Sequence, residues 1–274
     1  MSGQDLPASG FLEIAGSRLE YRLAGPQPRD APCLVLLHEG LGCARLWGDF
    51  PDRLQAATGT SVFVYSRAGY GASSPAALPR RTDYMHDEAL KVLPLVLDAI
   101  GFARGLLVGH SDGASIAALY AGSVQDHRLR GLALIAPHFV VEGISLQGIE
   151  AARAAYADTD LRVKLARWHK DVDNAFCGWN DVWLSPEFRA WDISENLAYI
   201  RVPVQIVQGS DDQYGTARQI EIAREECYCP VEAVILPGIG HAPHREAAEA
   251  TLAAVAGFVD HVLVAHGEGR KPIR

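Results

Sequence analysis

The sequence predicts an α/β fold: a mostly parallel sheet of eight strands, with helices on both faces and an inserted helical cap. Three patterns support this prediction. Short apolar runs of strand length recur along the chain, amphipathic stretches of helix length separate most of them, and one long interval contains no strand-like run. Continuous runs rich in Val, Leu and Ile are typical of strands buried on both faces, and their alternation with helices is typical of a parallel sheet.

Two predicted strands open the chain as a hairpin, and six more follow. Residues 11–14 and 19–23 alternate in polarity around Gly16-Ser17, which predicts an antiparallel pair. Six buried strands are predicted at residues 33–37, 61–65, 105–108, 131–135, 204–207 and 231–236. Helices are predicted at residues 83–100, 114–121, 216–227 and 247–264.

The rhythm of strands and helices breaks after the sixth predicted strand. Residues 138–200 contain helical patterns at 148–157 and 160–172, and four of the five tryptophans fall in this interval. We interpret it as a helical cap inserted into a core formed by residues 1–137 and 201–274. A chain of 274 residues suits one such domain with an insertion.

Composition favours a cytoplasmic protein that acts on a small molecule. The net charge of −8 gives no support for a nucleic acid or an anionic membrane as partner, and no uninterrupted apolar run reaches about 18 residues. The first residues lack the pattern of a signal peptide, and five scattered cysteines fit a reducing compartment. Cys227 and Cys229 have no second Cys or His pair at metal-ligand spacing, so we expect no metal there. We also expect no organic cofactor.

The strongest local signal is a G-x-S-x-G motif formed by Gly109, Ser111 and Gly113. A predicted strand precedes it and an alanine-rich helix follows it. A serine on a sharp strand-to-helix turn adopts a strained backbone, and its neighbours two residues away must be small to avoid clashes. The turn exposes the hydroxyl beside a helix N-terminus, where negative charge is favoured. This context predicts that Ser111 is a nucleophile.

A serine nucleophile needs a base and a carboxylate that orients the base. His241 lies in a Gly- and Pro-rich loop after the last predicted strand and is the preferred base, with His244 as the nearby alternative. Asp211 and Asp212 end the turn after strand 204–207, and either could hold the imidazole or cap the next helix. From the residues alone, Asp212 is preferred and Asp211 remains open.

The order of these motifs resembles that of the α/β-hydrolase superfamily over nearly the whole chain. The resemblance implies that Ser111 is the nucleophile. In that superfamily the acid follows a Gly-x-x-Asp pattern, which implies Asp212, and the base lies in a Gly-His loop, which implies His241. The superfamily also carries a helical cap after the sixth strand, which corresponds to residues 138–200.

The resemblance also implies an oxyanion hole made by two backbone amides. These belong to Asp112, directly after the nucleophile, and to Gly40, in the loop after the strand at 33–37. Glu39 stands where the superfamily usually has glycine, which makes the conformation of this loop an open question. Trp47, Trp179 and Trp183 are candidate residues of the substrate pocket, although Trp47 could equally be a core residue at the start of a helix.

Serine at position 111 favours acyl transfer. Superfamily members that open epoxides or displace halide have an aspartate at the corresponding position. We expect hydrolysis of a small carboxylic ester or thioester through an acyl-enzyme. A carbon–carbon bond hydrolase of ring-fission diketones is an alternative, because such enzymes share the same three residues. A non-catalytic ligand receptor on the same fold is the alternative from a different class of protein.

Overall fold

Eight strands form one sheet in the computed structural model, which describes residues 5–265 and 267. Their order is β1-β2-β4-β3-β5-β6-β7-β8; β1 and β2 are antiparallel, and the other six run parallel to one another. The strands are β1 (Ser9–Ile14), β2 (Ser17–Ala24), β3 (Cys33–Leu37), β4 (Ser61–Tyr65), β5 (Gly105–His110), β6 (Leu129–Ile135), β7 (Val204–Gly209) and β8 (Val231–Leu236). The predicted fold class is confirmed.

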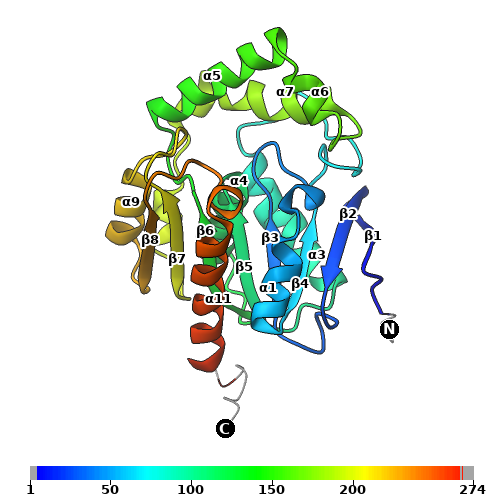
Figure 1. The fold of residues 1–274 in the computed structure, drawn as a ribbon, viewed down its shortest axis with the longest axis vertical. Helices are drawn as coiled ribbons and strands as arrows, with labels where there is room; N and C mark the ends of the chain where they lie inside the picture. Colours follow the sequence, from blue (N-terminus) through cyan, green and yellow to red (C-terminus); the bar gives the residue numbers. More distant parts are fainter. Residues whose placement is uncertain (1–4, 266, 268–274) are drawn as a thin grey trace.

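Helices follow most of the strands and fill the interval between β6 and β7. Outside that interval they are η1 (Ala44–Trp47), α1 (Phe50–Thr58), α2 (Tyr84–Asp87), η2 (Glu88–Val92), α3 (Leu93–Ala99), α4 (Asp112–Ser123), α9 (Arg218–Glu226), α10 (Pro243–Glu246) and α11 (Ala248–Ala265). Within it they are α5 (Gly143–Asp158), α6 (Leu161–Leu165), α7 (Val172–Trp183), η3 (Glu187–Ala190) and α8 (Ser194–Leu197). Figure 1 shows α5, α6 and α7 lying across the end of the sheet opposite the C-terminus.

The two faces of the sheet are buried by different helices, and the strands divide their side chains accordingly. In β3, Leu34 and Leu36 face α1 and α11, whereas Val35 and Leu37 face the side covered by α3, α4 and α9. Successive side chains of a strand point to opposite faces, so a strand buried on both sides must be apolar throughout. All five residues of β3 and all five of β4 are buried.

Among the residues that the structure describes, one helix, α11, is long and apolar enough, by length and composition alone, to cross a membrane. It carries Glu249 and Asp260, and the side chains of Val255, Phe258 and Val259 are buried in the core beside the sheet. Its helical partner in that layer is α1. These contacts describe a core helix of the folded domain.

The predicted helix at 160–172 is wrong as a single element. Helix α6 ends at Leu165, and α7 begins at Val172, where Asp171 accepts a capping hydrogen bond from the Asn174 amide. Between them, His169 accepts a hydrogen bond from the Gly71 amide and donates one to the Leu41 carbonyl. These long-range hydrogen bonds hold residues 166–171 outside the helix, and they cannot be predicted from the local pattern of apolar residues.

The strand order determines where a site can form. The chain passes from β3 to one neighbour, β4, and from β5 to the neighbour on the other side, β6. The loops after β3 and β5 therefore leave the sheet in opposite directions, and a crevice opens between them at the carboxyl edge. Gly40 lies in the first of these loops, and Ser111 follows β5 directly.

Candidate active site

Ser111 occupies a strained turn between β5 and α4. Its backbone angles are φ 52° and ψ −120°, in a region that residues other than glycine rarely adopt. A Cβ atom at Gly109 would lie 2.4 Å from the Ala114 Cα, and one at Gly113 would lie 2.0 Å from the Leu37 carbonyl oxygen. The G-x-S-x-G spacing thus follows from how closely the turn packs on α4 and β3.

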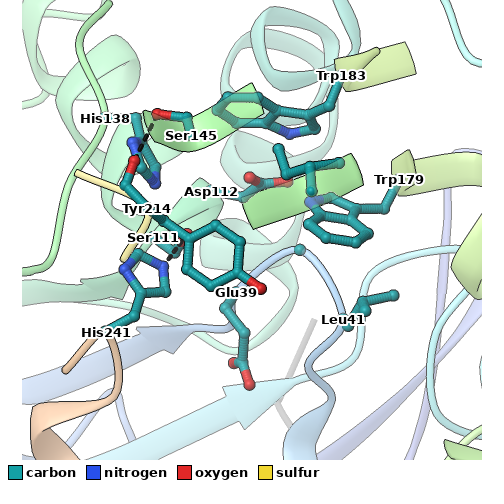
Figure 2. A pocket seen from close by; sticks show the side chains of 12 residues that line it. Glu39, Leu41, Ser111, Asp112, His138, Ser145, Trp179, Trp183, Tyr214 and His241 are labelled. Carbon is teal, nitrogen blue, oxygen red and sulfur yellow. Dashed lines mark hydrogen bonds between the residues drawn. The ribbon is translucent and has the colours of Figure 1, made fainter. Parts of the chain in front are cut away.

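Ser111, His241 and Asp212 form a continuous chain of hydrogen bonds. The Ser111 Oγ lies 2.9 Å from His241 Nε2 (Figure 2). His241 Nδ1 lies 2.8 and 2.9 Å from the two Asp212 carboxylate oxygens. Since a carboxylate only accepts, Nδ1 carries the proton and Nε2 accepts from the serine hydroxyl. The structure does not bring Asp211 or His244 into this chain: the Asp211 carboxylate accepts from Ser210, and His244 is buried.

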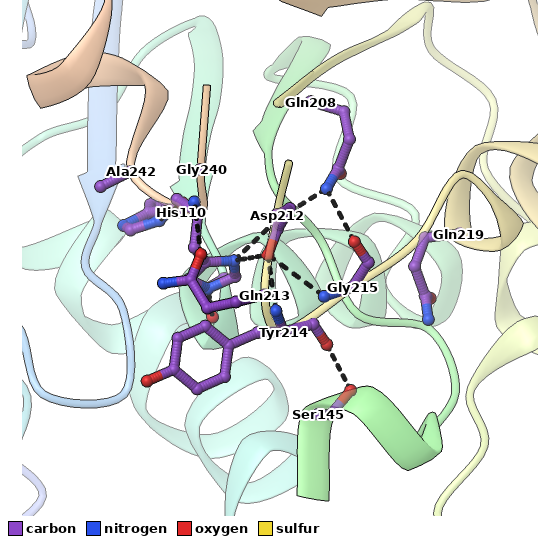
Figure 3. Close-up of polar contacts among 12 residues, drawn as sticks. His110, Ser145, Gln208, Asp212, Gln213, Tyr214, Gly215, Gln219, Gly240 and Ala242 are labelled. Atoms are coloured by element: carbon purple, nitrogen blue, oxygen red, sulfur yellow. Dashed lines mark hydrogen bonds and ion pairs between the residues drawn. The ribbon is translucent and has the colours of Figure 1, made fainter. Parts of the chain in front are cut away.

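Asp212 is held from several directions (Figure 3). Its carboxylate accepts hydrogen bonds from Gln208 Nε2 at 2.6 Å and from the amides of Tyr214 and Gly215 at 2.8 and 3.2 Å. Burial alone would raise the pKa of the Asp212 carboxyl, but the hydrogen bond and charge of His241 and the Tyr214 amide hold it below its usual value. The group is therefore an ionised acceptor with a fixed orientation.

A cavity opens over Ser111. Its floor comes from the loops at the carboxyl edge of the sheet, and its aromatic wall comes from α7 (Figure 2). The lining residues are Glu39, Gly40, Leu41, Ser111, Asp112, His138, Ser145, Ile149, Trp179, Trp183, Tyr214 and His241. The only charged groups of fixed sign among them are two acids, Glu39 and Asp112.

The loop that contains Gly40 is held from below by buried side chains. Arg67 donates to the His38 carbonyl at 2.5 Å and to the Glu39 carbonyl at 3.0 Å, and its guanidinium is buried. The Glu39 carboxylate accepts from Arg245 at 2.7 Å. Glu39 thus connects this loop to the segment after His241, and Arg67 fixes the loop backbone.

Both residues whose amides are expected to form an oxyanion hole line the cavity. Asp112 is the first residue of α4, and the first amides of a helix have no acceptor within it. Gly40 lines the cavity beside Ser111. The two candidate donors therefore belong to residues that line the same cavity as Ser111, one in the loop after β3 and one directly after the nucleophile.

Of the three tryptophans expected to line the pocket, two do so and one does not. Trp179 and Trp183 line the cavity from α7. Trp47 does not: its ring packs 5.7 Å from that of Phe50 and 4.8 Å from that of His244, in the core layer between the sheet and α11. The expectation that Trp47 lines the pocket is corrected, because η1 turns this side chain toward the core.

Several lining residues were not anticipated from the sequence, notably His138, Ser145, Ile149 and Tyr214. His138 follows the carboxyl end of β6, and burial together with the nearby His241 lowers its pKa to about 3, so its ring is neutral. Tyr214 follows Asp212 by two residues. Attention to every polar residue just beyond a parallel strand would have found both, because such residues gather at one edge. Ser145 and Ile149 depend on how α5 is placed.

Within the part of the chain that the structure describes, no group of three or more His, Cys, Asp or Glu side chains is placed to hold a metal ion.

The lack of a side chain at Gly40 leaves room for the Trp179 indole, and a substitution at Gly40 tests this contact. A Cβ at residue 40 would lie 2.2 Å from the Trp179 Nε1 and 2.3 Å from its Cδ1. We expect Gly40→Ala to displace the indole or the loop, destabilise the fold by about 1–3 kcal/mol, and lower kcat/KM by roughly 10–100-fold, as expected for a small misplacement at a reactive site. Thermal unfolding and ester hydrolysis measure the two effects.

Gly143→Ala is the matched control, because nothing lies within 4 Å of a Cβ there. In a Trp179→Ala background, Gly40→Ala should cost much less, since the clash is gone. Equal costs in both backgrounds would contradict this explanation.

Comparison with known proteins agrees with this geometry. Residues 34–255 match the model of the alpha/beta hydrolase family. The chain belongs to this family. The resemblance inferred from the motifs is thereby confirmed.

Individual relatives of this α/β hydrolase are distant. A proline iminopeptidase from Lactobacillus delbrueckii subsp. bulgaricus is 29% identical over 124 residues, which span 45% of this chain and 42% of that protein. Among solved structures, the proline iminopeptidase of Mycobacterium smegmatis has a TM-score of 0.73 at 20% identity, covering 94% of this chain and 99% of that one. The enol-lactonase of Burkholderia xenovorans LB400 has a TM-score of 0.70 at 20% identity, covering 91% and 99%. At such identities the structural likeness concerns the fold.

Proposed function

We propose that this α/β hydrolase is a serine hydrolase that cleaves a small carboxylic ester or thioester through an acyl-enzyme. The observation that supports it best is the hydrogen-bonded chain from Ser111 through His241 to Asp212, which opens on the cavity. A serine hydroxyl is a weak nucleophile at neutral pH, and an imidazole within hydrogen-bond distance is what activates it.

In the first half of the reaction, His241 Nε2 takes the proton from Ser111 as the Oγ bonds to the substrate's carbonyl carbon. The carbonyl π electrons move to the oxygen, which accepts hydrogen bonds from the amides of Gly40 and Asp112. Each such donor is worth about 2.7–4 kcal/mol of barrier. Collapse of the tetrahedral intermediate breaks the bond to the alcohol or thiol, which leaves with the proton from His241.

Water completes the cycle by the same steps. His241 removes a proton from the water as its oxygen bonds to the acyl carbon, the oxyanion is again held by the two amides, and Ser111 leaves with the proton returned by His241. Asp212 keeps the imidazole in the required tautomer and stabilises the imidazolium. The protein's own residues account for every proton in this cycle.

Division of the chain into a core of residues 1–137 and 201–274 and a cap of residues 138–200 forms part of the proposal. The helices of this insertion contribute Ser145, Ile149, Trp179 and Trp183 to the cavity. A cover of this kind excludes water and shapes the acyl or alcohol pocket. The insertion should therefore set specificity.

We expect Trp179→Ala and Trp183→Ala to change the relative kcat/KM across esters of increasing acyl length by about tenfold or more, because removal of an indole enlarges the pocket. Trp168→Ala is the matched control: this tryptophan lies in the same insertion but outside the cavity and is partly exposed. Rates across a series of nitrophenyl esters measure the effect. An unchanged length preference in both variants would show that the two rings serve only packing.

The experiment that tests the proposed reaction compares substrate classes on the purified protein. Short acyl nitrophenyl esters, acyl thioesters and a ring-fission diketone are assayed side by side. Turnover of esters or thioesters supports the proposal, and turnover of the diketone alone would assign the carbon–carbon bond hydrolase alternative. Binding without turnover of any of them would assign the receptor alternative. We further propose a cytoplasmic location, which the five free cysteines support.

A further inference from the structure

We propose that the cavity selects substrates whose acyl group carries a protonated amine close to the carbonyl carbon, and that the Asp112 side chain is the anionic partner of that amine. This inference rests on the proposed function, since it names the substrate class of the same site. It assigns to Asp112 a recognition role that is separate from the oxyanion contact of its backbone amide.

The first observation is an incompletely bonded buried carboxylate. The Asp112 side chain lines the cavity and is 1% exposed. Its Oδ2 accepts a hydrogen bond from the Tyr84 hydroxyl at 2.5 Å, whereas its Oδ1 has no partner among the described residues. Buried acceptors in native proteins are almost always bonded, so an unbonded one that faces a cavity points to a ligand that donates to it.

The second observation is that no cation among the described residues forms an ion pair with this carboxylate. Within the described residues, Asp112 forms no ion pair within 4.0 Å. The nearest guanidinium groups are already engaged: Arg67 donates to the carbonyls of residues 38 and 39, and Arg80 donates to the Ala68 carbonyl. Burial raises the pKa of the Asp112 carboxyl above its ordinary value, and the charges of Arg67 and Arg80 oppose this rise without cancelling it. A cation bonded to Oδ1 would therefore stabilise the ionised carboxylate.

The third observation is the character of the cavity walls. Figure 2 shows the Asp112 carboxylate near the indole rings of Trp179 and Trp183. The Trp183 Nε1 donates to the Tyr84 hydroxyl at 3.0 Å, which fixes that ring beside the carboxylate. Aromatic faces attract cations through their quadrupole, and none of the Lys and Arg residues that the structure describes lines the cavity. A carboxylate among aromatic rings favours an ammonium group over a neutral donor.

The position of Asp112 limits where the amine can be. The Asp112 amide is the proposed oxyanion donor. The Asp112 side chain therefore begins close to the substrate's carbonyl carbon, which Ser111 attacks. An ammonium bonded to Oδ1 must then lie on the acyl side, near the carbonyl carbon. The α-amino group of an amino acid ester meets this condition, whereas an amine on a distant part of the alcohol does not.

The test compares two benzyl esters that differ only at one group: L-alanine benzyl ester, with an ammonium on the α-carbon, and isobutyric acid benzyl ester, with a methyl in its place. Release of benzyl alcohol gives kcat/KM for each. We expect the wild-type protein to favour the alanine ester by about tenfold or more. In Asp112→Asn this ratio should fall by about 10–100-fold, as expected for loss of a charged hydrogen bond.

A ratio is used because any change in overall activity cancels within each variant. Asp211→Asn is the matched control: it removes the same charge from the exposed turn beside the site, and its ratio should match that of the wild type. Fluorophosphonate labelling of Ser111 in Asp112→Asn verifies that the site is intact. A wild-type ratio below one, or a ratio that Asp112→Asn leaves unchanged, would overturn the inference.

If no ester is hydrolysed at all, the proposed function fails, and the cavity is tested separately by calorimetric titration with L-alanine benzyl ester. Binding that Asp112→Asn abolishes and Asp211→Asn retains would uphold the inference. Absence of binding to the wild-type protein would overturn it.

Discussion

Replacement of Ser111 by alanine is expected to lower kcat for ester hydrolysis by about 10⁶-fold, the loss typical of removing a serine nucleophile. The fold should persist, because the hydroxyl does not cap α4, and its hydrogen-bond partner is His241. Stopped assays with wild-type and variant protein at equal concentration measure the loss, and circular dichroism checks the fold.

Ser123→Ala is the matched control for this variant. Ser123 is the exposed last residue of α4, the helix that Ser111 precedes, so its loss should leave kcat unchanged. If Ser111→Ala retained activity within tenfold of the wild type, Ser111 could not be the nucleophile.

Replacement of Asp212 by asparagine is expected to lower kcat by about 10⁴-fold. The asparagine amide can place an N–H against His241 Nδ1, which favours the tautomer with the proton on Nε2, and that nitrogen then cannot accept the Ser111 proton. Gln208 Nε2, which now donates to Asp212 at 2.6 Å, would hold the new side chain in place. Asp211→Asn, one residue away in the exposed turn, should change kcat by less than about twofold, within the range of surface substitutions. A large loss in Asp211→Asn with activity kept in Asp212→Asn would reverse the two assignments.

Much of the fold follows from the sequence, because the central strands β3, β4, β5 and β7 are buried on both faces. A strand such as β4 must be apolar along its whole length, and five consecutive apolar or small residues are visible without knowing their neighbours. The gap between residues 138 and 200 is visible for the same reason. The break between α6 and α7 was missed because it depends on His169 bonding to loops about a hundred residues away.

The candidate site was likewise predictable from the sequence only in part. Gly109, Ser111 and Gly113 are readable because one tight turn constrains all three, and Asp212 and His241 follow because each lies just beyond a strand. The direction of a side chain on a short helical turn cannot be predicted from the sequence, so Trp47 was a candidate for the pocket as well as for the core, and the structure places it in the core. The sequence also could not predict that Asp112 Oδ1 lacks a hydrogen-bond partner. This depends on how Tyr84 and Trp183, from helices distant in the sequence, pack beside Asp112.

The most direct test of the central claim is to map a fluorophosphonate adduct on the purified protein by mass spectrometry. Such probes bond to an activated serine, and activation requires the assembled chain from Asp212 through His241 to Ser111. We expect a single adduct on the peptide that contains Ser111, with labelling slowed strongly in Asp212→Asn and absent in Ser111→Ala. An adduct on another serine, or labelling that survives Ser111→Ala, would contradict the assignment of Ser111 as the nucleophile.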